Sequence, residues 1–237
     1  MRIREFGETD LLVTFFTAEK GQLKGVAKGA RKSRKRFVNC LDVFSLVNLE
    51  YGLKREGGLY FLHSGRLLNG YGGLRKDFSC VAVASYMIEL TEALFPPGVA
   101  DTEMFDLLKA SLETLARGGS GEKTAVVFEA RAMALGGYGI NLEKCCMCKR
   151  PYAGQGMAVF KPELGAIACL NCARGSARSP LMGPESVKIF SMLQSGPWET
   201  LWDVHLEETM IHEIRPVLKL HREYRLERRL KTAKYVE

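Results

Sequence analysis

The sequence predicts an α+β protein of several small domains: a β-rich N-terminal part, a helical part and a cysteine-bearing insertion. Three observations predict this organisation. Short apolar runs alternate with glycines over the first 76 of the 237 residues, the hydrophobic period becomes helical from Ser79, and four cysteines then interrupt the helical pattern. Hydrophobic residues make up 46% and charged residues 26% of the chain, which is the composition of an ordinary globular protein.

Four segments in the first 76 residues have the apolar and aromatic composition of strands, and glycine turns separate them. They are Leu11–Thr17, Leu23–Ala27, Val43–Tyr51 and Leu59–His63. Several short strands in so few residues favour a small β-barrel over a βαβ unit.

Helical periodicity predicts five later segments. Ser79, Asp101 and Pro184 stand where an N-cap or a first-turn residue is expected, and Pro216 predicts a bend. The predicted helices are Cys80–Phe95, Thr102–Arg117, Thr124–Leu135, Pro184–Gln194 and Glu199–Arg229.

The cysteine spacing is the strongest local signal in the chain. Cys145-x2-Cys148 is followed, after 20 residues, by Cys169-x2-Cys172. Two such pairs can place four thiolates around one Zn²⁺, and an all-cysteine ligand set leaves no open position for a catalytic water. We therefore expect one structural zinc ion per chain, held in a short hairpin or ribbon. A thioredoxin-like redox motif is disfavoured because it needs a single pair in a βαβ setting.

The remaining cysteines have less specific surroundings. Cys146 adjoins Cys145 and is expected to take no part in the metal site. Cys40 and Cys80 lie among apolar residues and are expected to be small core residues.

Charge is unevenly distributed along the chain. Residues 1–76 hold 15 Lys and Arg against 7 Asp and Glu, residues 77–214 hold 11 against 17, and residues 215–237 hold 8 against 3. Basic ends around an acidic middle point to an anionic partner, although charge that only aids solubility is the alternative.

The basic charge peaks at Lys28–Arg36, where six of nine residues are cationic. A cationic loop beside a β-barrel suits phosphate contacts made without regard to sequence. Lys24, Arg34, Lys35 and Arg36 are assigned to DNA contact from this local charge. Four aromatic residues either offer stacking surfaces or belong to the barrel core: Phe15, Phe16, Phe37 and Tyr60.

Catalytic and membrane signatures are missing from the sequence. Arg31 stands before Lys32 where a P-loop needs glycine, and His212 has no second histidine four residues on. No run of 18 to 20 apolar residues occurs, and residues 1–5 contain no apolar leader segment. We expect a non-enzymatic protein with no membrane partner.

Several motifs, taken in order, resemble the RecO family of bacterial recombination mediators. The resemblance rests on five pieces of the sequence and spans nearly the whole chain. These are Phe6–Thr17, Val26–Lys32, Tyr86–Leu90, Phe128–Tyr138 and the two cysteine pairs 145/148 and 169/172.

The resemblance implies an N-terminal OB-fold over residues 1–76, a helical bundle over 77–138 and 179–237, and a zinc-binding insertion over 139–178. Family members usually carry an extra apolar strand before the Gly-Glu-x-Asp motif. Only six residues precede Gly7 here, so either the first strand is shortened or the start codon is assigned too late. Lys28, Arg31 and Lys32 match the family motif and are assigned to DNA contact on that ground.

The resemblance further implies a cytoplasmic, nucleoid-associated protein that repairs DNA without being an enzyme. Its implied partners are single- and double-stranded DNA, the ring-shaped protein RecR, the acidic tail of single-strand-binding protein and, indirectly, RecA. Arg131 is the cation that we assign to the partner tail. The alternative from the residues alone is a zinc-ribbon RNA-binding or ribosome-associated adaptor.

Overall fold

The computed structural model describes residues 2–53, 58–173, 179–226 and 229–236. Parts of the expected domains, at residues 1, 54–57, 174–178, 227–228 and 237, lie outside the described residues. The strands are β1 (Arg2–Phe6), β2 (Asp10–Thr17), β3 (Gly21–Ala27), β4 (Leu46–Leu53), β5 (Tyr60–Asn69), β6 (Ala158–Lys161), β7 (Ala166–Cys169) and β8 (Leu181–Met182). The helices are α1 (Phe78–Leu94), α2 (Thr102–Ala116), α3 (Gly121–Leu135), α4 (Pro184–Ser195) and α5 (Glu208–Arg225).

The chain divides into two compact units. One consists of Met1–Ala84 with Phe95–Gly118, and the other of Ser85–Leu94 with Gly119–Glu237. The first contains the sheet β1–β5 and α2, whereas the second contains α3, α4, α5 and the cysteine insertion. The α+β class is confirmed, and the three-part domain boundaries expected from the sequence stay a prediction.

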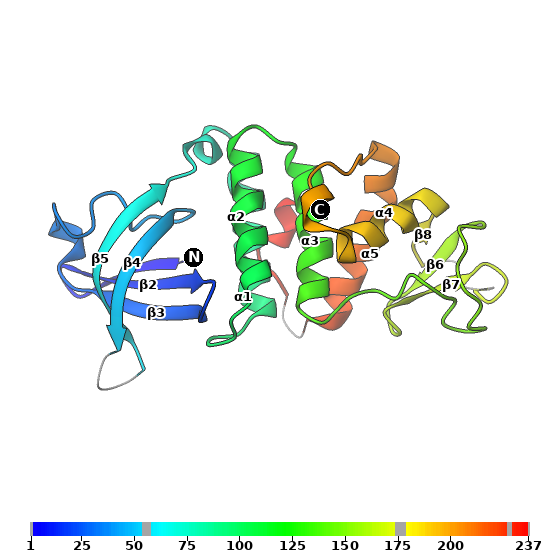
Figure 1. The fold of residues 1–237 in the computed structure, drawn as a ribbon, viewed down its shortest axis with the longest axis horizontal. Helices are drawn as coiled ribbons and strands as arrows, with labels where there is room; N and C mark the ends of the chain where they lie inside the picture. The colour runs from blue at the N-terminus through cyan, green and yellow to red at the C-terminus, as the bar shows by residue number, and fades with distance from the viewer. Residues whose placement is uncertain (1, 54–57, 174–178, 227–228, 237) are drawn as a thin grey trace. The chain divides into compact units, whose positions relative to one another are not determined.

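The N-terminal sheet has the strand order β1-β2-β3-β5-β4 (Figure 1). Its neighbours are antiparallel except β3 and β5, which run parallel where Val26 faces Phe61. This order is that of an OB-like sheet. All five residues of β1 pair with β2, from Arg2 opposite Thr14 to Phe6 opposite Asp10. A short first strand is therefore present, and in the described residues β1 and β4 are the two edges of the sheet.

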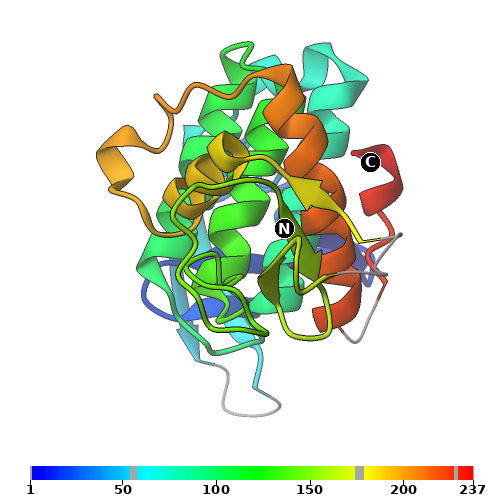
Figure 2. The ribbon, with the colours of Figure 1, turned by 90° about the vertical axis from the view of Figure 1, so that its right-hand side faces the viewer.

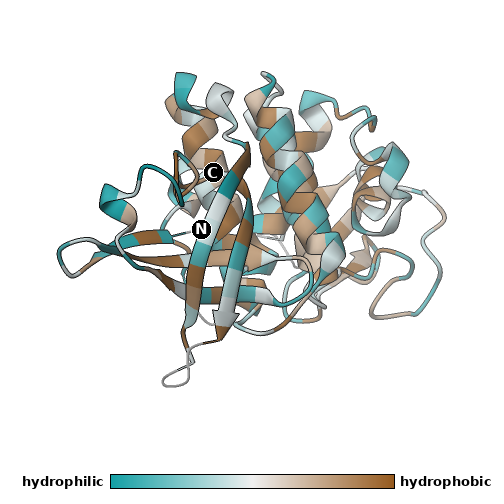
Figure 3. Ribbon diagram, turned by 60° about the vertical axis from the view of Figure 1, so that its left-hand side comes forward, coloured by the Kyte–Doolittle hydropathy of each residue, from teal (hydrophilic) through white to brown (hydrophobic). Residues whose placement is uncertain are grey.

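One face of this sheet forms the core of the first unit. Val13, Phe15, Leu23 and Leu62 lie in a buried cluster, joined by Cys40 as predicted. Successive strand residues point to opposite faces, so polar and apolar positions alternate along the strands (Figure 3).

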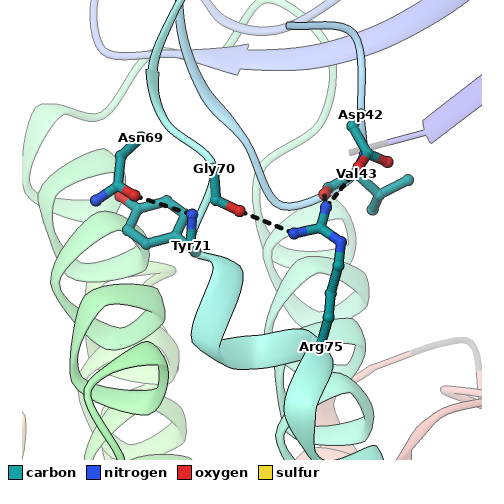
Figure 4. Close-up of polar contacts among 6 residues, drawn as sticks. All are labelled: Asp42, Val43, Asn69, Gly70, Tyr71 and Arg75. Atoms are coloured by element: carbon teal, nitrogen blue, oxygen red, sulfur yellow. Dashed lines mark hydrogen bonds and ion pairs between the residues drawn. The ribbon is translucent and has the colours of Figure 1, made fainter. Parts of the chain in front are cut away.

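Hydrogen bonds from Arg75 join the residues that follow β5 to the segment that precedes β4 (Figure 4). It lies in a short 3-10 helix, Gly72–Lys76. Its guanidinium donates to the Gly70 carbonyl at 2.8 Å, to Asp42 Oδ2 at 2.6 Å and to the Val43 carbonyl at 3.0 Å. The side chain thus joins residues more than 30 positions apart within the first unit.

Side-chain caps mark the starts of helices α1, α2 and α3. Asp101 caps α2 as predicted, because its Oδ1 accepts the Met104 N–H at 2.7 Å. For α1 the predicted cap was wrong: the Asp77 carboxylate, two residues before Ser79, accepts the Ser79 N–H at 2.9 Å. Helix α3 begins at Gly121, earlier than predicted, since Ser120 caps it.

The last predicted helix is shorter than the sequence indicates. Helix α4, by contrast, begins at Pro184 as predicted and ends at Ser195, one residue later than predicted. The predicted helix over 199–229 is limited to α5, which contains Pro216. Before it, Leu201 and Val204 are buried, and packing of these side chains outweighs the local helical pattern.

A buried ion pair lies inside the second unit. Arg222 of α5 donates through Nη1 to Glu129 Oε1 of α3 at 2.8 Å and to the Tyr86 hydroxyl at 2.7 Å. The Arg222 and Glu129 side chains are only 5% and 8% exposed. Burial and the neighbouring Glu129 charge raise the pKa of Tyr86 well above its usual value, so the hydroxyl stays protonated.

The cysteine insertion packs on the same helix. Its hairpin β6–β7 is extended by β8 (Figure 2). The Phe160 ring meets the His221 ring edge-on with centroids 5.7 Å apart, and Glu213 accepts the Gly183 N–H at 2.7 Å. Helix α5 therefore supports both β6 and the end of β8. Among the described helices, none is both long and apolar enough to cross a membrane.

Replacing Arg222 with alanine should lower the free energy of unfolding by about 3–5 kcal/mol, because Glu129 would remain as an uncompensated buried charge. Urea unfolding measures this. Lys188→Ala, on the exposed face of α4, is the control and should change stability by less than about 0.5 kcal/mol. A comparable small change in Arg222→Ala would contradict the role of the ion pair.

Candidate nucleic-acid interface and metal centre

The basic loop is anchored to the turn between β1 and β2. Asp10 accepts the Gly29 N–H through Oδ1 at 2.8 Å, and the Thr9 carbonyl accepts the Arg31 N–H at 3.1 Å. Gly29 has a φ of 63°, a left-handed conformation that favours glycine. A short 3-10 turn, Ala30–Lys32, follows it and buries Ala30 in the core of the sheet.

The Asp10 carboxylate is held in its ionised form. The hydrogen bond from the Gly29 N–H lowers the pKa of Asp10, with smaller help from the Thr9 hydroxyl and the Lys28 charge, against a partial opposing effect of desolvation. An ionised carboxylate is the stronger acceptor for the loop backbone.

Two of the seven predicted DNA-contact residues help to hold the loop. Arg31 pairs with Glu5 at 3.1 Å and donates through Nη1 to the Glu8 carbonyl at 3.1 Å. Arg36 donates through Nη2 to the Lys28 carbonyl at 2.6 Å. Both side chains are exposed, yet these bonds orient them towards the protein.

Three other cations of the loop point outwards. Lys32, Arg34 and Lys35 are exposed and form no ion pair with the described residues. Lys24 and Lys28 are also exposed, and Lys28 Nζ lies 5.4 Å from the centre of the Phe61 ring. The loop and the adjacent strand therefore form a cationic surface with one aromatic ring beside it.

Part of this cationic surface was not predicted from the sequence. Thr14 lies opposite Arg2 on one side and opposite Lys24 on the other, so these residues share a face of the sheet. Arg4 lies two positions from Arg2 on the same face and is exposed. The alternation of Arg2 and Arg4 around Ile3 was the signal that could have revealed β1.

The four aromatic residues that could have offered stacking surfaces pack inside the fold. Phe15 and Phe37 are buried, at 8% and 5% exposure. Phe16 packs near Phe105, and Tyr60 meets another tyrosine edge-on. The core alternative is therefore the one that the structure favours.

The second candidate site is a cluster of four cysteines. The sulfur atoms of Cys145, Cys148, Cys169 and Cys172 all lie within 4.8 Å of one another, so they could hold a metal ion. The first pair is bent by a turn in which the Lys149 N–H donates to the Cys145 carbonyl at 3.0 Å. The second pair is bent by bonds from the backbone N–H groups of residues 172 and 173 to the Cys169 carbonyl, both at 3.0 Å.

The chemistry of the donor set fits a divalent cation. Burial raises the pKa of Cys145, but backbone N–H groups of Cys148 and Cys169 outweigh it and lower the pKa to about 6. Hydrogen bonds with Cys169 and Cys148 raise the pKa of Cys172 to about 12. Four adjacent thiols resist joint deprotonation, and a bound cation would remove that penalty.

Comparison with known proteins identifies the family. The profile "Recombination protein O N terminal" matches residues 1–71, and "Recombination protein O C terminal" matches residues 75–234. The chain belongs to the RecO family.

Three RecO relatives illustrate the similarity, each a protein named DNA repair protein RecO. The Syntrophotalea carbinolica protein is 36% identical over 72% of this chain and 66% of its own length. The Syntrophus aciditrophicus protein is 34% identical over 83% and 75%, and that of Anaeromyxobacter sp. (strain K) is 31% identical over 100% and 93%. The chain is thus a member of a DNA repair family.

The structure explains two of the RecO motifs physically. The segments Phe6–Thr17 and Val26–Lys32 are separate in the sequence but meet through the bonds of Asp10 and Thr9 to the loop. The first motif therefore positions the second.

Arg131, the cation assigned to a partner tail, lies inside the RecO fold. It is 7% exposed. Its Nε donates to the Leu193 carbonyl at 2.8 Å, and its Nη2 donates to the Gly196 carbonyl at 2.7 Å. These bonds satisfy carbonyls at the C-terminal end of α4, which is a structural role. Contact with a partner stays an untested prediction.

The Asp10 bond predicts a pH response. The folded-state pKa of Asp10 lies below its ordinary value of 3.8, so its stabilisation of the loop is present above that pH and is lost as pH falls through the lowered pKa. In an NMR titration, the Gly29 amide shift should follow this ionisation. Asp10→Ala should abolish that step, whereas Asp42→Ala should preserve it. A Gly29 shift that titrates unchanged in Asp10→Ala would contradict the anchor.

Proposed function

We propose that this RecO-family chain is a non-enzymatic mediator that binds single- and double-stranded DNA and anneals complementary strands. The observation that carries the proposal is the anchored loop with its outward-pointing cations Lys32, Arg34 and Lys35. Lys24 and Lys28 extend the same surface. Arg31 and Arg36 complete the proposed contact set by holding the loop in place, and Arg2 and Arg4 join it from β1.

Annealing brings two polyanions together, and a cationic surface lowers their repulsion and releases counterions. The loop can do this without reading bases, since its contacts are made by flexible cations. A mediator of this kind needs no catalytic group, only a surface that binds and releases strands.

We further propose that the chain acts with RecR to load RecA onto DNA coated with single-strand-binding protein. A site suited to the acidic tail of that protein is a cavity of about 270 Å³ in the second unit. Ala125, Val126 and Pro216 give it apolar walls. Lys219 supplies a cation, Arg215 is a second cation that pairs with Glu122, and the Glu129 carboxylate in the lining is paired with Arg222. Such a combination suits a peptide that carries both apolar and acidic groups.

The cysteine cluster is proposed to hold one zinc ion per chain in a structural role. Cys145, Cys148, Cys169 and Cys172 would all be ligands, which closes the coordination sphere. The hydrophobic cluster around them is small, comprising Cys145, Val159, Ala168 and Ala173. Metal binding would supply the folding free energy that so small a core lacks.

The purified protein should contain one zinc ion per chain by elemental analysis. Cys145→Ser should lose the metal and unfold the insertion, because structural zinc contributes on the order of 10 kcal/mol to folding. Cys146→Ser is the matched control, since its sulfur lies outside the four-cysteine group. A metal-free folded protein with unaltered stability in Cys145→Ser would refute the zinc proposal.

Reversing the charge of Lys32, Arg34 and Lys35 together should abolish annealing of strands precoated with single-strand-binding protein. If Lys28 and these three cations each neutralise one phosphate, the slope of log affinity against log salt should change from roughly −3 to roughly −1 on single strands. An annealing time course and anisotropy titrations at several salt concentrations measure both effects.

Lys188→Glu serves as the control for a change of net charge and should anneal as the unmodified protein does. No acceleration by the folded, unmodified chain would overturn the annealing proposal. Unchanged affinity in the triple variant would overturn the assignment of the loop.

A further inference from the structure

The cysteine insertion is a basic island in an acidic part of the chain. Residues 139–178 hold six Lys and Arg and two acidic residues, Glu143 and Glu163, whereas the rest of residues 77–214 holds five against 15. Four thiolates with one divalent cation would add two negative charges, which leaves the island cationic. This charge lies outside the basic loop of the first unit and has no part in the function proposed above.

A cavity of about 320 Å³ opens beside the two cysteine pairs. Its volume lies at the lower end of the roughly 300–1,000 Å³ range of small-ligand sites. Arg150, Tyr152, Gln155, Leu170 and Asn171 are among its lining residues. All five come from the insertion, so the cavity belongs to one compact unit.

The cavity wall is preorganised. The Tyr152 hydroxyl donates to the Gly156 carbonyl at 2.7 Å, and its backbone N–H donates to the Glu143 carbonyl at 2.7 Å. These two bonds fix the tyrosine while the cations Lys144 and Arg150 stay exposed near it. The cavity therefore combines a fixed aromatic wall with exposed cations.

The exposed groups around the cavity match those of a nucleobase. The side-chain amides of Gln155 and Asn171 are exposed and offer both donors and acceptors, as base edges require. Leu170, which follows Cys169 and lines the cavity, is 51% exposed and adds apolar surface. A peptide backbone also offers donors and acceptors, so it is the fixed aromatic wall of Tyr152 that favours a base over an acidic peptide.

We propose that the cysteine insertion is a second single-strand-binding site. It takes one unstacked base in the cavity while Arg150 and Lys144 contact the adjacent phosphates. A single strand is the ligand because bases in a duplex stay stacked and cannot enter a cavity, whereas bases in single strands are free to do so.

This inference rests on the proposed function and extends it. With a DNA surface in each compact unit, one chain could hold two strands at once, as annealing requires.

Photo-cross-linking tests the proposal. The zinc-loaded full chain is irradiated with an oligothymidylate that contains 4-thiothymidine, and the modified peptides are identified by mass spectrometry. Cross-links within residues 144–172 are expected, both in the unmodified chain and in the variant with Lys32, Arg34 and Lys35 replaced by alanine.

Arg150→Glu should reduce these cross-links about tenfold, because it replaces a phosphate contact with charge repulsion. Lys188→Glu, the same charge change on α4, should leave them unaltered, and zinc content should be unaltered in both. Tyr152→Phe keeps the ring and should retain most of the signal.

Cross-links confined to the basic loop would overturn the second site and leave the proposed function standing. Absence of binding by either unit would instead overturn the proposed function itself. If Arg150→Glu weakened an acidic peptide but not the oligonucleotide, the island would be a protein-docking surface and the nucleic-acid inference would fail.

Discussion

The structure has to keep like charges close together in two places. Six of the nine residues in Lys28–Arg36 are cationic, and four cysteine sulfurs lie within 4.8 Å of one another. In the loop, the Asp10 carboxylate and backbone carbonyls offset the repulsion. In the cluster, backbone N–H groups do the same for Cys145, and a bound cation would complete the compensation. Fixed polar groups, namely the Asp10 carboxylate and groups of the backbone, therefore make both clusters of like charge compatible with folding.

The two solutions differ in what they leave exposed. Arg31 and Arg36 hold the loop in place through an ion pair and a hydrogen bond. Lys32, Arg34 and Lys35 remain exposed to solvent and form a surface suited to anions. The cysteine cluster leaves no such excess, because all four of its sulfurs could coordinate one metal ion. The loop is accordingly suited to binding and the cluster to structure.

Several charged side chains of the second unit are buried inside it. Arg222 is shared between Glu129 and Tyr86, and Arg131 satisfies carbonyls at the end of α4. Removing a buried partner is costly even where the pair itself adds little net stability, so such residues fix which helices pack together. The exposed cations of the cysteine insertion are therefore distinct from the buried cations, Arg222 and Arg131, that join the helices to one another.

The sequence by itself determined the α+β class, the position of the basic loop and the four-cysteine cluster, because charge density and Cys-x2-Cys spacing are local properties of the chain. It also predicted α2 and its Asp101 cap. Only the tertiary structure decided which arginines of the loop are engaged, that β1 carries Arg2 and Arg4 beside Lys24, and that Arg131 and Arg222 are buried. Those outcomes depend on contacts between residues as far as 136 positions apart, such as Arg222 and Tyr86, and no local pattern records them.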